Sequence, residues 1–196
     1  MGRKAEIERI TKETTVRLTI ELDGEGRTDI STGIPFFDHM LTLAAVHGFF
    51  DITLQAKGDL EVDAHHTVED VGIVLGDAVA SALGDRRGIR RYGHAVTPMD
   101  EALAAVTLDL SRRPYLVFDL PAGDVADPAF SRSLAKEFFK SVANHGGLNL
   151  HVSVPYGENG HHVIEAVFKS FGRALRQAVD LDPRSAGGVR SSKGAL

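Results

Sequence analysis

The sequence predicts an α/β protein made of two copies of one unit, each a small sheet covered on one face by two helices. Three observations support this prediction. The motif His-His-x-x-Glu occurs at 65–69 and again at 161–165, and each copy opens a stretch with apolar residues at helical spacing. Segment 12–22 is echoed by 100–110, and His47-Gly48 corresponds to His145-Gly146. Patterns that recur in the same order indicate an internal duplication.

The first half, about 1–90, contains the first copy of the pattern. Alternating residues or short apolar runs predict strands at 5–10, 16–22, 27–30 (a return strand after the turn signal Asp23-Gly24), 51–56 and 60–62. Helical spacing predicts one helix from Pro35 to Gly48 and another from the first motif to about Gly84. The Gly- and Arg-rich segment 85–92 reads as the connector to the second half.

The second half, about 91–182, repeats this pattern and is followed by a tail, 183–196. Strands are expected at 100–110, 115–120 and 148–154, and helices at 134–142 and from the second motif to about Val179. Superposing the two His-Gly pairs places His39 opposite Glu137. His39 is then the natural extra metal ligand of its half, and Glu137 is its carboxylate counterpart.

Composition sets limits on the function. The 196 residues suffice for a sizeable core, with 43% hydrophobic and 25% charged residues. A formal net charge of -5 argues against nonspecific nucleic-acid binding, and the absence of cysteine excludes disulfides and thiolate chemistry. Residues 1–9 lack the apolar segment of a signal peptide, and no apolar run approaches the roughly 20 residues that cross a bilayer. We therefore expect a cytoplasmic protein without a membrane or nucleic-acid partner.

The repeated motif indicates a metal site. In the first copy, His65 and Glu69 are one helical turn apart on one face, while His66 is rotated by about 100°. A single copy would fit a solvated helix start, but a solvated face gives no reason to repeat the same ligands at the same spacing. Imidazole and carboxylate without thiolate suit Mn, Fe, Co or Zn. Helix geometry suggests one ion between His65, Glu69 and His162, and a second between His161, Glu165 and His66.

Other polar and aromatic residues have simpler interpretations. Arg86, Arg87 and Arg90 are expected to be solvated, and His47 and His145 to cap helix ends. His94 and His151 read as structural, and the pairs Phe49-Phe50 and Phe138-Phe139 as core or subunit contacts.

Several runs are specific enough to identify a family. They are FFDHML (36–41), DAHHTVEDVGIVLG (63–76), GIRRYG (88–93), PMDEAL (98–103), RPYLVF (113–118), HHVIEAVFKSFGRALRQA (161–178) and SSKGAL (191–196). Together they closely resemble imidazoleglycerol-phosphate dehydratase of histidine biosynthesis, over essentially the whole chain. The resemblance implies one dehydratase domain, 1–196, with no fused phosphatase. It also implies half-domains like domain 2 of ribosomal protein S5, each a small mixed sheet with two helices.

The same resemblance implies two Mn²⁺ per active site and a homo-oligomer, a 24-mer built from trimers, with active sites shared between subunits. The implied metal ligands are His39, His65, His66, Glu69, Glu137, His161, His162 and Glu165. The implied substrate contacts are Glu13, His39, His65, Glu69, Arg91, Arg113, His161, Lys169, Ser191, Ser192 and Lys193. Some family members carry His where this chain has Glu137, which replaces a neutral nitrogen ligand with an anionic oxygen.

The implied reaction removes water from the glycerol side chain of imidazoleglycerol phosphate and gives imidazoleacetol phosphate. No carbonyl acidifies the hydrogen that is lost, so the ring has to act as the electron sink. We expect a metal-bound imidazolate that expels hydroxide to give a diazafulvene-like intermediate. Glu13 is the leading candidate for proton transfer, followed by Asp100, Glu101 and Glu165. Arg91 and Arg113, with the tail 191–193, would bind the phosphate.

Two other functions fit the motif alone. A dinuclear metallohydrolase would use the same ligands to activate water and would release inorganic phosphate. A metal-binding assembly protein would only join subunits through its ions, and Glu13→Gln or Arg113→Ala would leave its properties unchanged.

Overall fold

The computed structural model describes residues 2–121, 130–185 and 187–194. The first half consists of β1 (Lys4–Ile10), β2 (Thr14–Glu21), β3 (Thr28–Ser31), α1 (Pro35–Gly48), β4 (Asp51–Gly58) and α2 (His65–Leu83). The second consists of β5 (Tyr92–Met99), β6 (Ala102–Asp109), β7 (Tyr115–Asp119), α3 (Arg132–Gly146), β8 (Asn149–Tyr156) and α4 (Gly160–Val179). A short 3-10 helix, η1 (Pro183–Ser185), lies in the tail.

The two halves share one topology. The strand orders are β1-β2-β4-β3 and β5-β6-β8-β7, and in each sheet the last pair is parallel while the others are antiparallel. Each half is therefore a small mixed sheet with two helices, which confirms the duplication predicted from the repeated motif.

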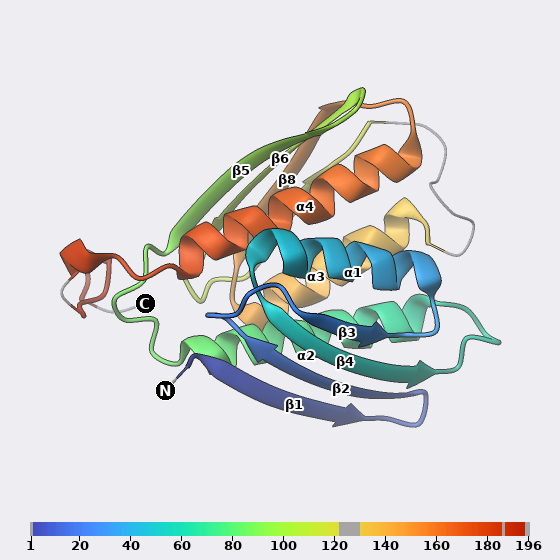
Figure 1. Ribbon diagram of the computed structural model, residues 1–196, viewed down its shortest axis with the longest axis horizontal. Helices are drawn as coiled ribbons and strands as arrows, with labels where there is room; N and C mark the ends of the chain where they lie inside the picture. The colour runs from blue at the N-terminus through green and yellow to red at the C-terminus, as the bar shows by residue number, and fades with distance from the viewer. Residues whose placement is uncertain (1, 122–129, 186, 195–196) are drawn as a thin grey trace.

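The helices lie between the two sheets (Figure 1). In the first half α2 packs on β1 and β2, in the second α4 packs on β5 and β6, and the halves meet where α2 contacts α3 and α1 contacts α4. Fully buried phenylalanines fill this helical layer, with Phe138 stacked on Phe168 at 5.4 Å and edge-on to Phe37 at 5.2 Å between ring centroids. Burial of this apolar surface fixes the helix N-termini that carry the two motifs.

Two strand predictions were wrong, and one strand was missed. Residues 60–62 form a turn, in which the Val62 N–H donates to the Asp59 carbonyl at 2.8 Å, instead of a strand. The return strand β3 does not lie beside β2, because β4 occupies that position and β3 pairs with β4 in parallel. Strand β5 was missed because Gly93 interrupts its apolar pattern. That glycine is needed because a Cβ there would lie 1.8 Å from the Ala174 carbonyl oxygen of α4.

The connector between the halves is partly buried, which corrects the expectation for Arg86. Its guanidinium is buried and donates to the carbonyl oxygens of Gly146 at 2.6 Å and Gly147 at 3.2 Å, at the C-terminal end of α3. Burial lowers the pKa of Arg86 to about 10. His47 and His145 do not supply the C-caps of α1 and α3. The C-cap positions are held by Phe49 and Gly147, whose backbones are left-handed, at φ 55° and 61°.

The other structural expectations divide between core and surface. His145 pairs with Asp77 of α2 at 3.1 Å. Phe50, Phe138 and Phe139 are buried core residues, whereas Phe49 is 56% exposed. Among the described helices, none is long and apolar enough to cross a membrane.

Candidate metal and substrate site

Three predicted metal ligands converge where α1 meets the start of α4. Glu165 Oε2 lies 3.1 Å from His161 Nε2 and 3.6 Å from His39 Nε2, and one ligand atom from each residue lies within 4.8 Å of the others. The side chain of Asn159 caps α4 by accepting the His161 N–H at 2.9 Å. His161 also packs edge-on against Phe36, at 5.1 Å between ring centroids. We call His39, His161 and Glu165 the closed cluster.

The carboxylate of the closed cluster is held in its charged form. Burial raises the pKa of Glu165. The hydrogen bond and charge of Lys169, together with those of His161, lower the pKa by more than burial raises it, so the net shift is downward. Lys169 Nζ lies 2.6 Å from Glu165 Oε1, which leaves Oε2 facing the two histidines. This is where the structure places the predicted substrate contact Lys169, and the arrangement presents an ionised oxygen and two imidazole nitrogens to one point.

The glutamate of the first motif is more exposed than that of the second. His65 Nε2 and Glu69 Oε2 are 3.9 Å apart, and Glu69 is 41% exposed against 9% for Glu165, whereas His65 and His161 are similarly exposed, at 44% and 42%. Glu137, on α3, instead pairs with Lys140 of its own helix at 3.0 Å. Within the described ranges, these three side chains do not form a second group as tight as the closed cluster.

The second histidine of each motif has its own carboxylate partner. His66 Nδ1 lies 3.0 Å from Asp59 Oδ2 and 3.8 Å from Glu13 Oε2, while His162 Nδ1 lies 2.7 Å from Glu101 Oε2. Hydrogen bonds to these carboxylates raise the pKa of both histidines. Neither histidine shares the carboxylate of its own motif.

Acidic residues surround His162 and His66. The predicted catalytic residue Asp100 is 74% exposed, and its Oδ2 lies 3.9 Å from His162 Nε2. Sequence reasoning missed Asp59 as a partner of His66. The feature that could have pointed to it is that Asp59 lies in a loop longer than the corresponding loop of the second half. The hydrogen bond of His162 lowers the pKa of Glu101 to about 2, with help from backbone N–H groups that include that of Asn159.

The predicted phosphate contacts gather at the other end of the molecule. They line a cavity of about 720 Å³, formed by Arg91, Tyr92, Arg113, Arg190, Ser191, Ser192 and Lys193. Asp109 organises it, since its carboxylate binds Arg91 at 2.6 and 2.9 Å and lies 3.7 Å from Arg113. Arg91 also stacks over Tyr92, with its guanidinium carbon 4.8 Å from the ring centroid. Arg190 is paired with Asp182 at 3.2 Å, so the four lining cations outnumber the two carboxylates that pair with them, and the cavity suits an anion.

The predicted metal ligands and the predicted phosphate contacts of one chain lie far apart. The Arg91 N–H donates to the carbonyl of Ala178, near the C-terminus of α4, whereas His161 lies in the first turn of that helix. The 17 residues between His161 and Ala178 span about 25 Å of helix axis. Figure 1 shows the chain tail and the start of α4 at opposite ends of the molecule. One chain therefore does not bring its two groups of predicted contacts together.

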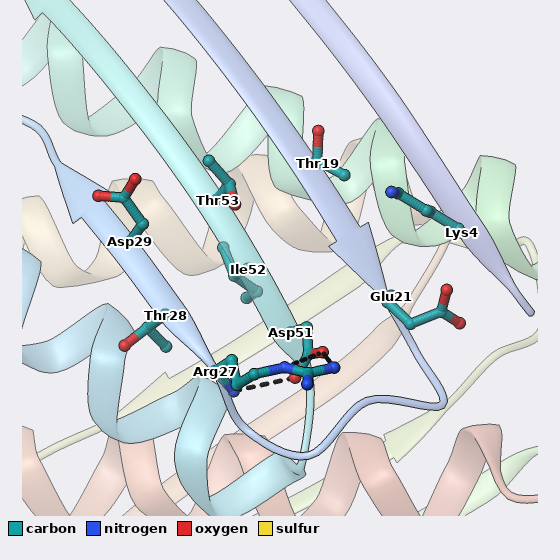
Figure 2. Close-up of a pocket in the computed structure, with 9 residues that line it drawn as sticks. All are labelled: Lys4, Thr19, Glu21, Arg27, Thr28, Asp29, Asp51, Ile52 and Thr53. Carbon is teal, nitrogen blue, oxygen red and sulfur yellow. Dashed lines mark hydrogen bonds and ion pairs between the residues drawn. The ribbon is translucent and has the colours of Figure 1, made fainter.

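A separate hollow of about 400 Å³ lies on the outer face of the first sheet, and Figure 2 shows its lining. The Arg27 and Asp51 side chains pair there at 2.6 Å, beside Lys4, Glu21 and Asp29. In the described part of the chain, no predicted site residue lines this hollow. It is a charged sheet surface outside the candidate site.

Comparisons with known proteins identify the family of the chain. The profile of the imidazoleglycerol-phosphate dehydratase family matches residues 32–175. Imidazoleglycerol-phosphate dehydratase of Desulfosudis oleivorans is 59% identical over 100% of both chains. The one from Syntrophobacter fumaroxidans is 57% identical over 99% of this chain and 98% of its own.

Solved structures show the same fold. A crystal structure of IGPD from Pyrococcus furiosus in complex with (S)-C348 has a TM-score of 0.84 at 36% identity, covering 97% of this chain and 100% of that one. The imidazoleglycerol-phosphate dehydratase of Staphylococcus aureus has a TM-score of 0.82 at 36% identity, covering 91% and 99%. The chain therefore belongs to the imidazoleglycerol-phosphate dehydratase family, hydro-lyases of histidine biosynthesis.

Proposed function

We propose that this hydro-lyase dehydrates D-erythro-imidazoleglycerol phosphate to imidazoleacetol phosphate with two Mn²⁺ per active site, in sites shared between copies of the chain. The observation that carries the metal part is the closed cluster of His39, His161 and Glu165. The separation of that cluster from the phosphate cavity supports the sharing of sites.

The donor set of the closed cluster fits a divalent ion of the manganese type. Two imidazole nitrogens and one ionised carboxylate oxygen, without sulfur, are ligands that such an ion accepts. The remaining proposed ligands are His65, His66, Glu69, Glu137 and His162. When bound, the two ions would supply Lewis acidity toward the ring nitrogen and the departing hydroxyl group.

The residues of the chain then have to move one proton and direct the loss of one hydroxide. The hydroxyl that is lost lies on the carbon next to the ring, and the hydrogen that is lost lies on the following carbon. Ring electrons therefore expel the hydroxide first, through a diazafulvene-like intermediate, and loss of the proton from the following carbon then gives the enol of the ketone. Glu13 is 56% exposed and lies beside His66, within reach of a bound substrate. We assign it the proton transfer, with Asp100 near His162 as the second candidate.

The phosphate cavity would anchor the other end of the substrate. Arg91 is held rigidly by Asp109, whereas Arg113 and Lys193 are exposed cations that can close on a phosphate. A substrate with one ring and a three-carbon chain is far shorter than about 25 Å of helix. Ring and phosphate contacts would therefore come from different chains, which supports an assembly of several copies; the 24-mer built from trimers is what the family resemblance implies.

The chemistry is tested by turnover of metal-stripped protein with imidazoleglycerol phosphate, before and after addition of Mn²⁺. Ketone formation and free phosphate are followed in parallel. We expect Mn²⁺-dependent ketone with phosphate retained on the product. Free phosphate would support the metallohydrolase instead, and full activity without a divalent ion would contradict the metal proposal.

The sharing of sites is tested by complementation. His39→Ala and Arg113→Ala chains are each expected to be inactive, because one lacks a metal ligand and the other a phosphate contact. Disassembled and reassembled together, they should regain part of the activity, since some mixed sites would combine intact residues from both chains. No recovery in mixtures whose co-assembly is verified would show that each site lies within one chain.

A further inference from the structure

The second histidine of each motif is held by a carboxylate, but the two carboxylates come from different parts of the two halves. In the second half, Glu101 of the β5–β6 turn binds His162 Nδ1 at 2.7 Å. In the first half, Asp59 of the β4–α2 loop binds His66 Nδ1 at 3.0 Å. Since an ionised carboxylate only accepts hydrogen bonds, each Nδ1 carries the proton, and Nε2 is the ring nitrogen left to ligate an ion.

Loop length explains why the partners differ. The β8–α4 loop has only residues 157–159, and it folds over Glu101, which accepts the backbone N–H groups of Glu158 at 3.2 Å and Asn159 at 2.7 Å. The β4–α2 loop is longer, spanning 59–64, and carries a carboxylate of its own to His66. Glu101 therefore binds both His162 and the backbone that precedes α4. In the first half a different residue, Asp59, makes the contact to the histidine.

Because of this difference, Glu13 is not hydrogen-bonded to the histidine of its half. By the duplication it corresponds to Glu101, and both lie in the turn between the first two strands of their half. Yet Glu13 Oε2 stands 3.8 Å from His66 Nδ1, beyond hydrogen-bond distance, and its side chain is 56% exposed against 33% for Glu101. Asp59, 20% exposed, occupies the position that Glu13 would otherwise take.

We propose that Asp59 is a positioning residue that orients His66 for metal binding and thereby leaves Glu13 free to act on the substrate. The inference rests on the proposed function, since it requires that His66 ligates an ion. An exposed surface ion pair would contribute almost nothing measurable. The recurrence of one carboxylate–Nδ1 contact in both halves, supplied by unrelated loops, argues that the contact serves the outward Nε2.

The test measures Mn²⁺ affinity and turnover separately in Asp59→Asn, Glu101→Gln and Glu13→Gln. Mn²⁺ affinity is measured by isothermal titration of metal-stripped, assembled protein. Glu61→Gln is the matched control, because it removes an exposed carboxylate from the same loop. Asp59→Glu, which restores the charge at a slightly longer reach, is the conservative variant. Thermal unfolding of the metal-free proteins checks that the fold is intact.

We expect Asp59→Asn and Glu101→Gln to weaken Mn²⁺ binding about 10- to 100-fold, with turnover restored largely at high Mn²⁺. Glu13→Gln should leave Mn²⁺ affinity within about twofold and lower kcat about 100-fold or more, without rescue by the ion. Asp59→Glu should recover part of the affinity, and Glu61→Gln should match the wild type.

Two results would overturn the inference. One is unchanged Mn²⁺ affinity in Asp59→Asn while the wild type binds the ion tightly. The other is a loss of Mn²⁺ affinity in Glu13→Gln as large as that in Asp59→Asn, because Glu13 would then be the orienting residue. These outcomes leave the proposed function standing. A wild type that turns over without binding Mn²⁺ would instead refute the proposed metal function, and this inference with it.

Discussion

The two halves have one topology but differ at the metal motifs. In the second half, Glu165 is 9% exposed and meets His161, His39 and Lys169, although the two histidines are 42% and 48% exposed. In the first half, Glu69 is 41% exposed, and Glu137 pairs elsewhere. The contrast teaches that duplication reproduced the backbone positions of the ligands, whereas the surroundings that charge and desolvate them were set separately in each half.

The outer faces of the two sheets differ even more. One row across the first sheet carries Glu6, Thr19, Thr53 and Asp29. The corresponding row of the second sheet carries His94, Thr107, His151 and Val117. Of the two central threonines, Thr19 is kept as Thr107 while Thr53 is replaced by His151, and both acids are also replaced. His94 Nδ1 lies 3.0 Å from the Thr107 hydroxyl. Buried positions constrain side chains through packing, but exposed faces are free to diverge.

The largest expected difference between the halves concerns their two motif glutamates in metal-free protein. Glu165→Gln leaves the Lys169 ammonium, which is 17% exposed, without its partner at 2.6 Å, so we expect the free energy of unfolding to fall by about 2–4 kcal/mol. Glu69→Gln removes an exposed carboxylate and should change it by less than about 0.5 kcal/mol. Urea denaturation after chelation measures both.

The double variant Glu165→Gln/Lys169→Met is the control for that prediction. It removes both charges, so it should recover much of the loss. Equal losses in Glu165→Gln and Glu69→Gln would contradict the distinction between a closed and an open motif.

A smaller difference is expected at the helix ends. Gly147 has φ 61°, and a Cβ there would lie 3.0 Å from Arg112 Cα, so Gly147→Ala should cost about 1–2 kcal/mol of unfolding free energy. Phe49 holds the same left-handed position at φ 55°, so Phe49→Gly should gain up to about 1 kcal/mol. Chemical denaturation of both variants checks the signs. A loss of stability in Phe49→Gly would mean that the phenyl contacts outweigh the backbone strain.

The smallest predicted effect concerns Asp51, which corresponds to Asn149 in the second half. Backbone N–H groups of Arg27 and Glu25, with the Arg27 side chain, lower the pKa of Asp51 from 3.8 to about 2 (Figure 2). A depressed carboxyl pKa stabilises the folded state above the unfolded pKa, and this contribution is lost as the pH falls through the folded value. Asp51→Asn should therefore cost about 1 kcal/mol at pH 7.

The pH profile distinguishes this account from a packing effect. The stability difference between wild type and Asp51→Asn should stay constant from pH 7 to about 4 and shrink toward pH 2. Denaturant titrations at several pH values measure it. A difference that is independent of pH would show that the charge of Asp51 is not what stabilises the strand.

Sequence reasoning succeeded where the information is local. Helical and strand periodicities predicted α1, α2, α3 and α4 and most strands, and the repeated motif predicted the duplication. It failed where the answer depends on distant partners. The position of β3 depends on the preference of β2 for β4, and the burial of Arg86 depends on the approach of α3 to the connector. The local sequence around these residues does not reveal either contact.

The candidate site divides in the same way. The i,i+4 spacing predicted that His161 and Glu165 share a face. The alignment of the halves assigned His39 to the motif of its own half, but within one chain α1 packs against α4 and His39 joins the second motif. The roles of Asp59 and Asp109 depend on the paths of a loop and a strand end, so their residue types gave no warning.

The length of α4 has a kinetic consequence. It keeps the cations of one chain about 25 Å from the proposed metal ligands of the same chain, so under the proposed function an isolated chain would hold two half-sites and no whole one. Activity would then depend on subunit concentration: specific activity should fall on dilution below the dissociation constant of the assembly, with a lag as chains reassociate. Assembly would act as the on-switch of catalysis, and free chains emerging from synthesis would be silent until they find their neighbours.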